Sequence, residues 1–224
     1  MSLPVIHVQR PVAIAGLNAD QIDKTNPKHL VPRTFPGVGV QYLNPQAARC
    51  YDALSVFFNQ GTGLILSCAG QGSGHRSYRT QVNAFSLRMT LTYSVTINGI
   101  VNQFKNTRLW NGTPGNRGPG ALRKYYLRKG MIPVAIPGGG WHPFGLALDI
   151  AIYDPATKTI RSIRSNTKAW NWMIANANTC GWSWENPTVG VDDPHLHYWA
   201  GDKIPARVLQ LEAFFKAAAK NEQA

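Results

Sequence analysis

Alternation between apolar and other residues is clearest from Gly138 to Tyr153, where a glycine-rich stretch leads into a predicted strand. At a period of two residues, one face of this strand carries only aliphatic side chains, at positions 146, 148, 150 and 152. The other face carries small residues and one acid, Asp149. A carboxylate inside a domain costs several kcal/mol unless a cation or hydrogen-bond donors compensate it. Two explanations stay open: a metal shared with His142, or a buried carboxylate bonded to a loop amide.

The remaining pattern predicts an α+β fold with a single domain at residues 45–224. Residues 1–44, rich in proline and asparagine, are predicted to form an extended N-terminal arm. Residues 94–120 are polar and contain Asn-Gly and Pro-Gly pairs, which predicts a long loop or insertion. Helices are predicted at 44–59, 78–89, 122–129, 166–177 and 205–220, and further strands at 64–68, 160–163, 181–185 and 191–199.

The net charge of +12, from 23 basic and 11 acidic side chains, indicates a polyanionic partner or surroundings. The basic residues are scattered and match no nucleic-acid-binding motif, so the acidic polymers of a bacterial wall explain the charge equally well. No apolar run approaches the roughly 20 residues of a membrane span, and no partner membrane is expected. The N-terminus lacks the pattern of a cleavable signal, so we expect export by another route.

Three cysteines, Cys50, Cys68 and Cys180, have no metal-type spacing, and their number is odd. We expect them to be buried as small apolar groups. Two of the six histidines are better candidates for chemistry, because His195 and His197 share one face of a predicted strand. Two histidines and one aspartate suit catalytic zinc, which takes three protein ligands and keeps one position for water.

Three segments in order along the chain resemble the VanY-type D-alanyl-D-alanine carboxypeptidases. These belong to a group of zinc peptidases that also contains the phage L-alanyl-D-glutamate endolysins. The first segment is Ser73-Gly-His-Arg-Ser-Tyr-Arg-Thr-Gln81, similar to Ser-Gly-Tyr-Arg-Ser-Tyr-x-x-Gln. The second is His142-Pro-Phe-Gly-Leu-Ala-Leu-Asp149, similar to His-x-x-Gly-x-Ala-x-Asp. The third begins with Gly181-Trp-Ser-Trp-Glu185 and continues from Asp192 to Asp202.

The resemblance implies a small antiparallel sheet flanked by helices, as in hedgehog-like DD-peptidases, with Zn²⁺ held by His142, Asp149 and one histidine of the third segment. Aligning Tyr198 without a gap makes His195 the third ligand and puts Asp192 at the position of the catalytic Glu. The other register makes His197 the ligand and places Pro194, which cannot act as a base, three residues before it. The resemblance also implies that Arg76 polarises the scissile carbonyl, and that the substrate is contacted by Ser73, Tyr78, Gln81 and His197.

The implied reaction is metal-assisted hydrolysis of an amide in a peptidoglycan stem peptide, by D-Ala-D-Ala carboxypeptidase or L-Ala-D-Glu endopeptidase action. The chain departs from the family pattern at Gly140, where Ser is usual, at Asp192, where Glu is usual, and at Pro194, where Trp is usual. These departures leave open a non-catalytic wall-binding or structural module in which zinc staples the fold.

Wall chemistry without a signal peptide predicts a bacteriophage product, either a lysin released through a holin or a hydrolase carried on the virion tail. Other tail proteins are then possible partners, and the arm at 1–44 and the helix at 205–220 are candidates for docking to them.

Overall fold

The structure is a computed structural model that describes residues 17–97, 100–106, 125–127, 140–184 and 195–221. It consists of two compact units, and each is described by itself. The first unit contains the described residues of 1–17, 21–76 and 141–224, and the second contains those of 18–20 and 77–140. Within the described ranges, no helix combines the length and the hydropathy that a membrane span requires.

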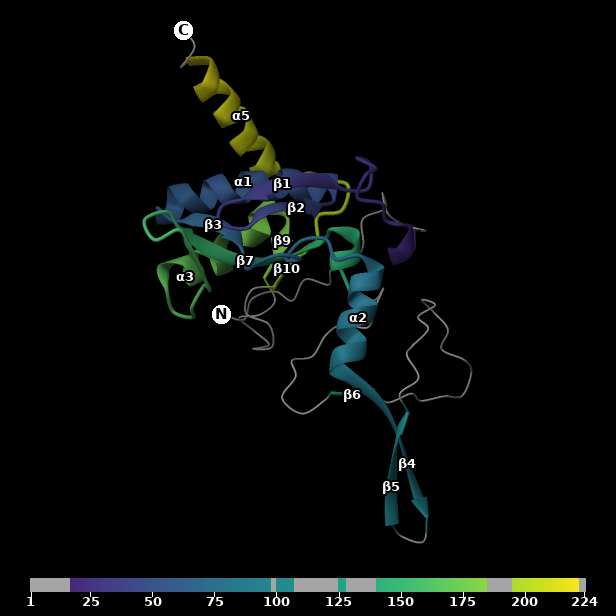
Figure 1. The fold of residues 1–224 in the computed structure, drawn as a ribbon. Coiled ribbons are helices and arrows are strands. Elements are labelled where there is room, and N and C mark those ends of the chain that lie inside the picture. The colour runs from purple at the N-terminus through teal and green to yellow at the C-terminus, as the bar shows by residue number, and fades with distance from the viewer. Residues whose placement is uncertain (1–16, 98–99, 107–124, 128–139, 185–194, 222–224) are drawn as a thin grey trace. The chain divides into compact units, whose positions relative to one another are not determined.

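The described part of the first unit is built on a five-stranded antiparallel sheet (Figure 1). The long strand β7 (Ala147–Asp154) lies between β3 (Ile65–Cys68) and β10 (His195–Tyr198). Strand β9 (Trp182–Ser183) pairs with β10, and β8 (Thr159–Arg161) pairs with the end of β7. The strand predicted around Asp149 is therefore an interior strand with a partner on each side.

Three helices of this unit confirm the sequence pattern. Helix α1 (Pro45–Thr62) begins at Asn44, whose side chain accepts a hydrogen bond from the backbone N–H of Gln46. It ends at Gly63, in the left-handed conformation at φ 75°, three residues later than predicted. Helices α3 (Lys168–Asn176) and α5 (Ala206–Asn221) lie where helices were expected, and the short 3₁₀ helix η4 (Ala177–Cys180) continues α3.

The aliphatic face of the sheet packs toward α1. Leu148, Ile150 and Leu196 are fully buried, and the hydroxyl of Tyr198 accepts a hydrogen bond from the Cys50 thiol of α1 at 3.7 Å. All three cysteines are free and buried, as predicted, and burial raises the pKa of the Cys50 thiol to about 12. Around Leu148, Ile150 and Leu196, this face is packed core.

The N-terminal segment has more regular structure than an extended arm where it is described. Strands β1 (Val31–Phe35) and β2 (Gly39–Leu43) form an antiparallel hairpin, preceded by the 3₁₀ helix η2 (Ala19–Gln21). Phe35 and Leu43 are buried, and the backbone N–H of Asn44 donates to the carbonyl of Gly145. The hairpin therefore supports the loop that precedes β7. Residues 1–16 lie outside the described part.

The second unit corrects two expectations. It contains α2 (Tyr78–Arg88) and strands β4 (Met89–Ile97), β5 (Ile100–Asn106) and β6 (Tyr125–Leu127), in the order β5-β4-β6. The long loop predicted for 94–120 was wrong for 94–97 and 100–106, which lie in β4 and β5, and the helix predicted for 122–129 was wrong for 125–127. Residues 89–97 alternate strictly between apolar and hydroxyl side chains before Asn98-Gly99, which is a hairpin signal.

Candidate metal centre

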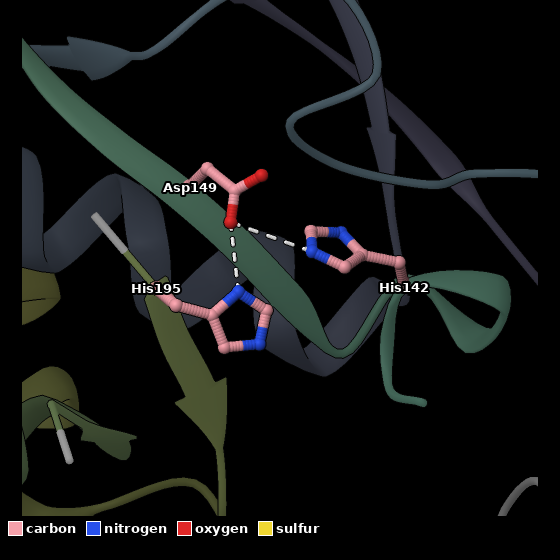
Figure 2. A group of neighbouring side chains, drawn as sticks. All are labelled: His142, Asp149 and His195. Carbon is pink, nitrogen blue, oxygen red and sulfur yellow. Dashed lines mark hydrogen bonds and ion pairs between the residues drawn. The ribbon is translucent and has the colours of Figure 1, made fainter. Parts of the chain in front are cut away.

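Two neighbouring strands bring the first pair of polar side chains together. In the antiparallel register of β7 and β10, Asp149 is the direct partner of His195. Directly opposed residues project from the same face of a sheet, with Cβ atoms about 5 Å apart. The His195 Nδ1 atom accordingly lies 2.7 Å from Oδ1 of Asp149 (Figure 2).

The third side chain comes from the turn before β7. His142 begins the 3₁₀ helix η3 (His142–Phe144), which ends at Gly145 with φ 64°. A Cβ atom at position 145 would lie 2.5 Å from the backbone N of Asn44 and 2.5 Å from Leu30 Cδ2. Only glycine therefore allows this tight return into the strand, which gives a physical reason for the His-x-x-Gly spacing.

The imidazole of His142 is held with one nitrogen free for a ligand. Its Nδ1 lies 2.7 Å from the carbonyl oxygen of Gly74, and because a carbonyl only accepts, Nδ1 carries the proton. Nε2 then presents its lone pair at 3.4 Å from Oδ1 of Asp149 (Figure 2). Burial, the largest effect, lowers the pKa of His142 and favours the neutral ring. A neutral, oriented imidazole is the form that binds metals.

Asp149 lies at the centre of the cluster and is 8% exposed. Burial acts to raise the pKa of Asp149, but the hydrogen bond from His195 and the charge of Arg76 outweigh it and hold the pKa below its usual range. The carboxylate is therefore ionised. Its two oxygens have different partners. Oδ1 faces the two histidines, and Oδ2 accepts a hydrogen bond from Nη2 of Arg76.

The second nitrogen of His195 also has a specific partner. Nε2 of His195 lies 2.8 Å from Nε2 of His197, the next residue on the same face of β10. If Nδ1 of His195 coordinates a metal, Nε2 carries its proton and donates it to the lone pair of His197. The ring of His197 packs in turn against Trp141, with 5.6 Å between ring centroids.

Arg76 lies beside the cluster at the end of the loop that follows β3. Its Nε donates to the carbonyl of Gly72 at 2.5 Å, and its backbone N–H donates to the carbonyl of His142. Nη1 makes no hydrogen bond to any described residue, and the side chain is 35% exposed. The guanidinium therefore has a fixed position and free N–H groups for a substrate carbonyl or carboxylate.

The arrangement has the donor set and spacing of a divalent metal site. One ligand atom each from His142, Asp149 and His195 lie within 4.8 Å of one another. Ligands of a tetrahedral zinc ion, about 2.1 Å from the metal, lie about 3.4 Å apart. The 3.4 Å between Nε2 of His142 and Oδ1 of Asp149 matches this value, and the 2.7 Å between Nδ1 of His195 and the same oxygen is the shorter distance of a direct hydrogen bond. Two nitrogens and one carboxylate oxygen fit zinc, as predicted, and leave a coordination position for water or substrate.

Other predicted site residues have varied positions. Ser73 is buried in the first unit, where its hydroxyl accepts from the N–H of Gly70 and its carbonyl accepts from the N–H of Asp149. These bonds fasten the loop to β7. Tyr78 and Gln81 lie on α2 of the second unit, and Asp192 lies outside the described residues, so their assigned roles stay predictions.

Residues 41–201 match the family described as VanY, D-alanyl-D-alanine carboxypeptidase. The chain belongs to this family. The match contains the first two segments that carried the resemblance and the third as far as Gly201, as well as the residues of the metal cluster. The predictions of a zinc peptidase of the VanY family and of an α+β fold are confirmed.

Two solved structures of VanY proteins are similar to the chain. One is VanYB in complex with D-alanine-D-alanine, at 15% identity and a TM-score of 0.42, covering 94% of this chain and 96% of that one. The other is a variant of the vancomycin-resistance D,D-pentapeptidase VanY in complex with Zn(II), at 14% identity and a TM-score of 0.39, covering 85% and 91%. The comparison with curated proteins gave no match.

Two contacts that hold the histidines of the metal cluster in place were not predicted from the sequence. The carbonyl of Gly74 fixes the tautomer of His142, and Trp141 packs on His197. A backbone carbonyl leaves no trace in residue type, so the first could not be found. Trp141 lies directly before a predicted ligand, and its large ring was a signal that could have been used.

Proposed function

We propose that this VanY-family protein removes the terminal D-alanine from peptidoglycan stem peptides. The observation that supports it best is the convergence of His142, Asp149 and His195 on one point, with Arg76 beside them. In the proposed site, zinc is held by Nε2 of His142, a carboxylate oxygen of Asp149 and Nδ1 of His195. Bound zinc supplies Lewis acidity toward the scissile carbonyl and the attacking water.

Arg76 has two tasks in this proposal. Its bond to Oδ2 of Asp149 orients the carboxylate so that Oδ1 faces the histidines. Its remaining N–H groups bind the substrate, either at the carbonyl oxygen that gains charge or at the terminal carboxylate of D-alanine. A guanidinium suits both because it is always charged and forms paired hydrogen bonds.

Proton transfer is assigned to Asp192, on the alignment of the third segment. An acid three residues before His195 accepts the proton of the attacking water and returns it to the leaving amine. Because Asp is one methylene shorter than Glu, the variant Asp192→Glu tests whether reach limits the rate. Asp192→Ala is expected to lose hydrolysis while binding zinc normally.

The site of cleavage separates the carboxypeptidase from the related endopeptidase. A diacylated L-Lys-D-Ala-D-Ala peptide contains the D,D bond and no L-Ala-D-Glu bond, whereas muropeptides contain both. We expect release of D-alanine from both substrates, loss of release after metal chelation and recovery on adding zinc. Cleavage of muropeptides only at L-Ala-D-Glu would instead identify an endopeptidase, and zinc binding without any cleavage would favour the structural module.

Action on the bacterial wall and a bacteriophage source are part of this proposal. They rest on the substrate class of the family and on the sequence resemblance to phage endolysins. A zone of clearing when purified protein is added to isolated cell walls would support a lytic role. Release of D-alanine without loss of wall turbidity would show trimming of stem peptides and would contradict lysis.

A further inference from the structure

A second polar feature of the first unit lies away from the metal cluster. It is a hollow of about 660 Å³ between β7, the segment after β8 and the start of α3. Its apolar wall is formed by Leu64, Ile152 and Ala169, and its polar wall by three cationic and two hydroxyl side chains: Arg161, Arg164, Lys168, Ser162 and Thr167.

The positive charge around this hollow is not neutralised by ion pairs among the described residues. None of the three cationic side chains forms an ion pair with a described residue. Residues 158–168 contain four basic residues and no acid. The acid just before this run, Asp154, accepts hydrogen bonds from the N–H groups of Ala156 and Thr157 in the turn. Like charges that face one hollow repel each other, and an anion there relieves the repulsion.

The hollow is separate from the metal centre. Ile152 and Asp149 are three residues apart on β7, so their side chains leave opposite faces of the strand. Lys168 donates to the carbonyl of Thr62, the last residue of α1, which places the hollow on the helix-covered face. A ligand held there does not fill the space beside Asp149.

We propose that this hollow binds a phosphate-diester segment of an anionic cell-wall polymer. Each diester offers two unesterified oxygens, and the forked guanidinium groups of Arg161 and Arg164 match that geometry. The apolar wall suits the carbon face of the sugar or polyol between phosphates. That the polymer belongs to the wall rests on the proposed function. The site would hold the enzyme beside its substrate.

Nucleic acid, the other phosphate-diester polymer, is disfavoured by the lining. Proteins that bind single strands without sequence preference stack bases on aromatic side chains. The residues that line this hollow include no aromatic ring. Its recognition elements are cations, hydroxyls and aliphatic groups.

The test uses the full-length protein and three probes: a glycerol-phosphate polymer, single-stranded DNA with the same number of phosphates, and inorganic phosphate. The variant is Arg161→Gln with Arg164→Gln, both exposed positions. The matched control is Lys28→Gln with Lys203→Gln, which removes the same charge from exposed positions elsewhere. We expect the Arg pair to weaken polymer binding about tenfold, and the control less than twofold, because two local contacts are lost.

Release of D-alanine from a soluble peptide should be unchanged in both variants, so failure of polymer binding is distinguishable from failure of the catalytic proposal. Equal losses in the two double variants would show that overall charge drives binding, and would overturn the site. Tighter binding of DNA than of the wall polymer would overturn the ligand class. Displacement of the polymer by an equal phosphate concentration of inorganic phosphate would identify a site for the free ion instead.

Discussion

The two faces of β7 differ in how they contribute to the protein. Leu148, Ile150 and Ile152 are at most 5% exposed on the helix-covered face and contribute packing. The other face carries Asp149 between Ala147 and Ala151, whose small side chains leave room for the imidazoles. One strand therefore stabilises the fold with one face and carries chemistry on the other. Substitutions on the two faces should have opposite consequences for stability and activity.

The largest effect is expected from Asp149→Asn. The amide keeps the shape but loses the negative charge that the metal, the histidines and Arg76 share, so activity should fall on the order of 10³-fold or more. Steady-state release of D-alanine measures it. The matched control is Asp154→Asn, at the other end of the same strand, which should keep near-normal activity. Comparable losses in both would contradict a special role for Asp149.

The substitution Leu148→Ala tests the helix-covered face of β7. It removes a fully buried side chain, so the free energy of unfolding should fall by about 2–5 kcal/mol. Urea denaturation measures the change, and zinc binding of the folded fraction should stay within about twofold of the wild type. A large loss of zinc affinity in the folded protein would show that the two faces are not independent.

Acid should lower the free energy of unfolding through His75, which lies on the loop beside the metal cluster. Burial is the main cause that lowers its pKa to about 4, and its Nε2 is buried without a hydrogen bond to a described residue. In the unfolded protein His75 takes up a proton near pH 6.5, whereas in the folded protein it stays neutral down to about pH 4. His75 therefore leaves the free energy of unfolding unchanged above about pH 6.5 and lowers it as the pH falls from about 6.5 to 4. The loss is at most about 3 kcal/mol.

Denaturation of the wild type and of His75→Gln at several pH values measures this loss. The stability difference between the two proteins should change in that pH window and be constant above it. A difference that is the same at pH 4 and pH 7 would rule out His75 as the source.

A smaller effect is expected at His197, which accepts from His195 in the proposed centre. His197→Phe removes the acceptor, and zinc affinity should fall roughly 10- to 100-fold, while His197→Gln keeps an acceptor and should recover part of it. Competition with a chromophoric chelator measures both. Normal zinc affinity with a raised KM in His197→Phe would support the predicted substrate contact instead.

Residue type and spacing were enough to predict the ligand-bearing strand and the histidine pair of the closing strand, whereas the choice of His195 as the ligand came from the family resemblance. Asp149 was conspicuous because it interrupts a buried pattern, and His195 because it alternates with buried residues on a short strand. The contact of Arg76 with Asp149 joins residues 73 positions apart and was not predicted, because the family resemblance placed Arg76 at the site only as a group that binds the substrate.

The hairpin of β4 and β5 was missed for a different reason. Its hydroxyl side chains were taken as loop polarity, although Thr and Ser alternating with apolar residues describe a strand with one polar face. The β1–β2 hairpin contains Pro32 and sits in a proline-rich stretch, so local composition obscured it. For β4, the alternation of side chains is a better guide than composition.

Anomalous diffraction at the zinc absorption edge, from crystals of the zinc-loaded protein, shows which side chains bind the ion. We expect a peak in the first unit within bonding distance of Nε2 of His142, a carboxylate oxygen of Asp149 and Nδ1 of His195. A zinc-loaded crystal without a peak among these three atoms, or with zinc bound by His197 in place of His195, would contradict it.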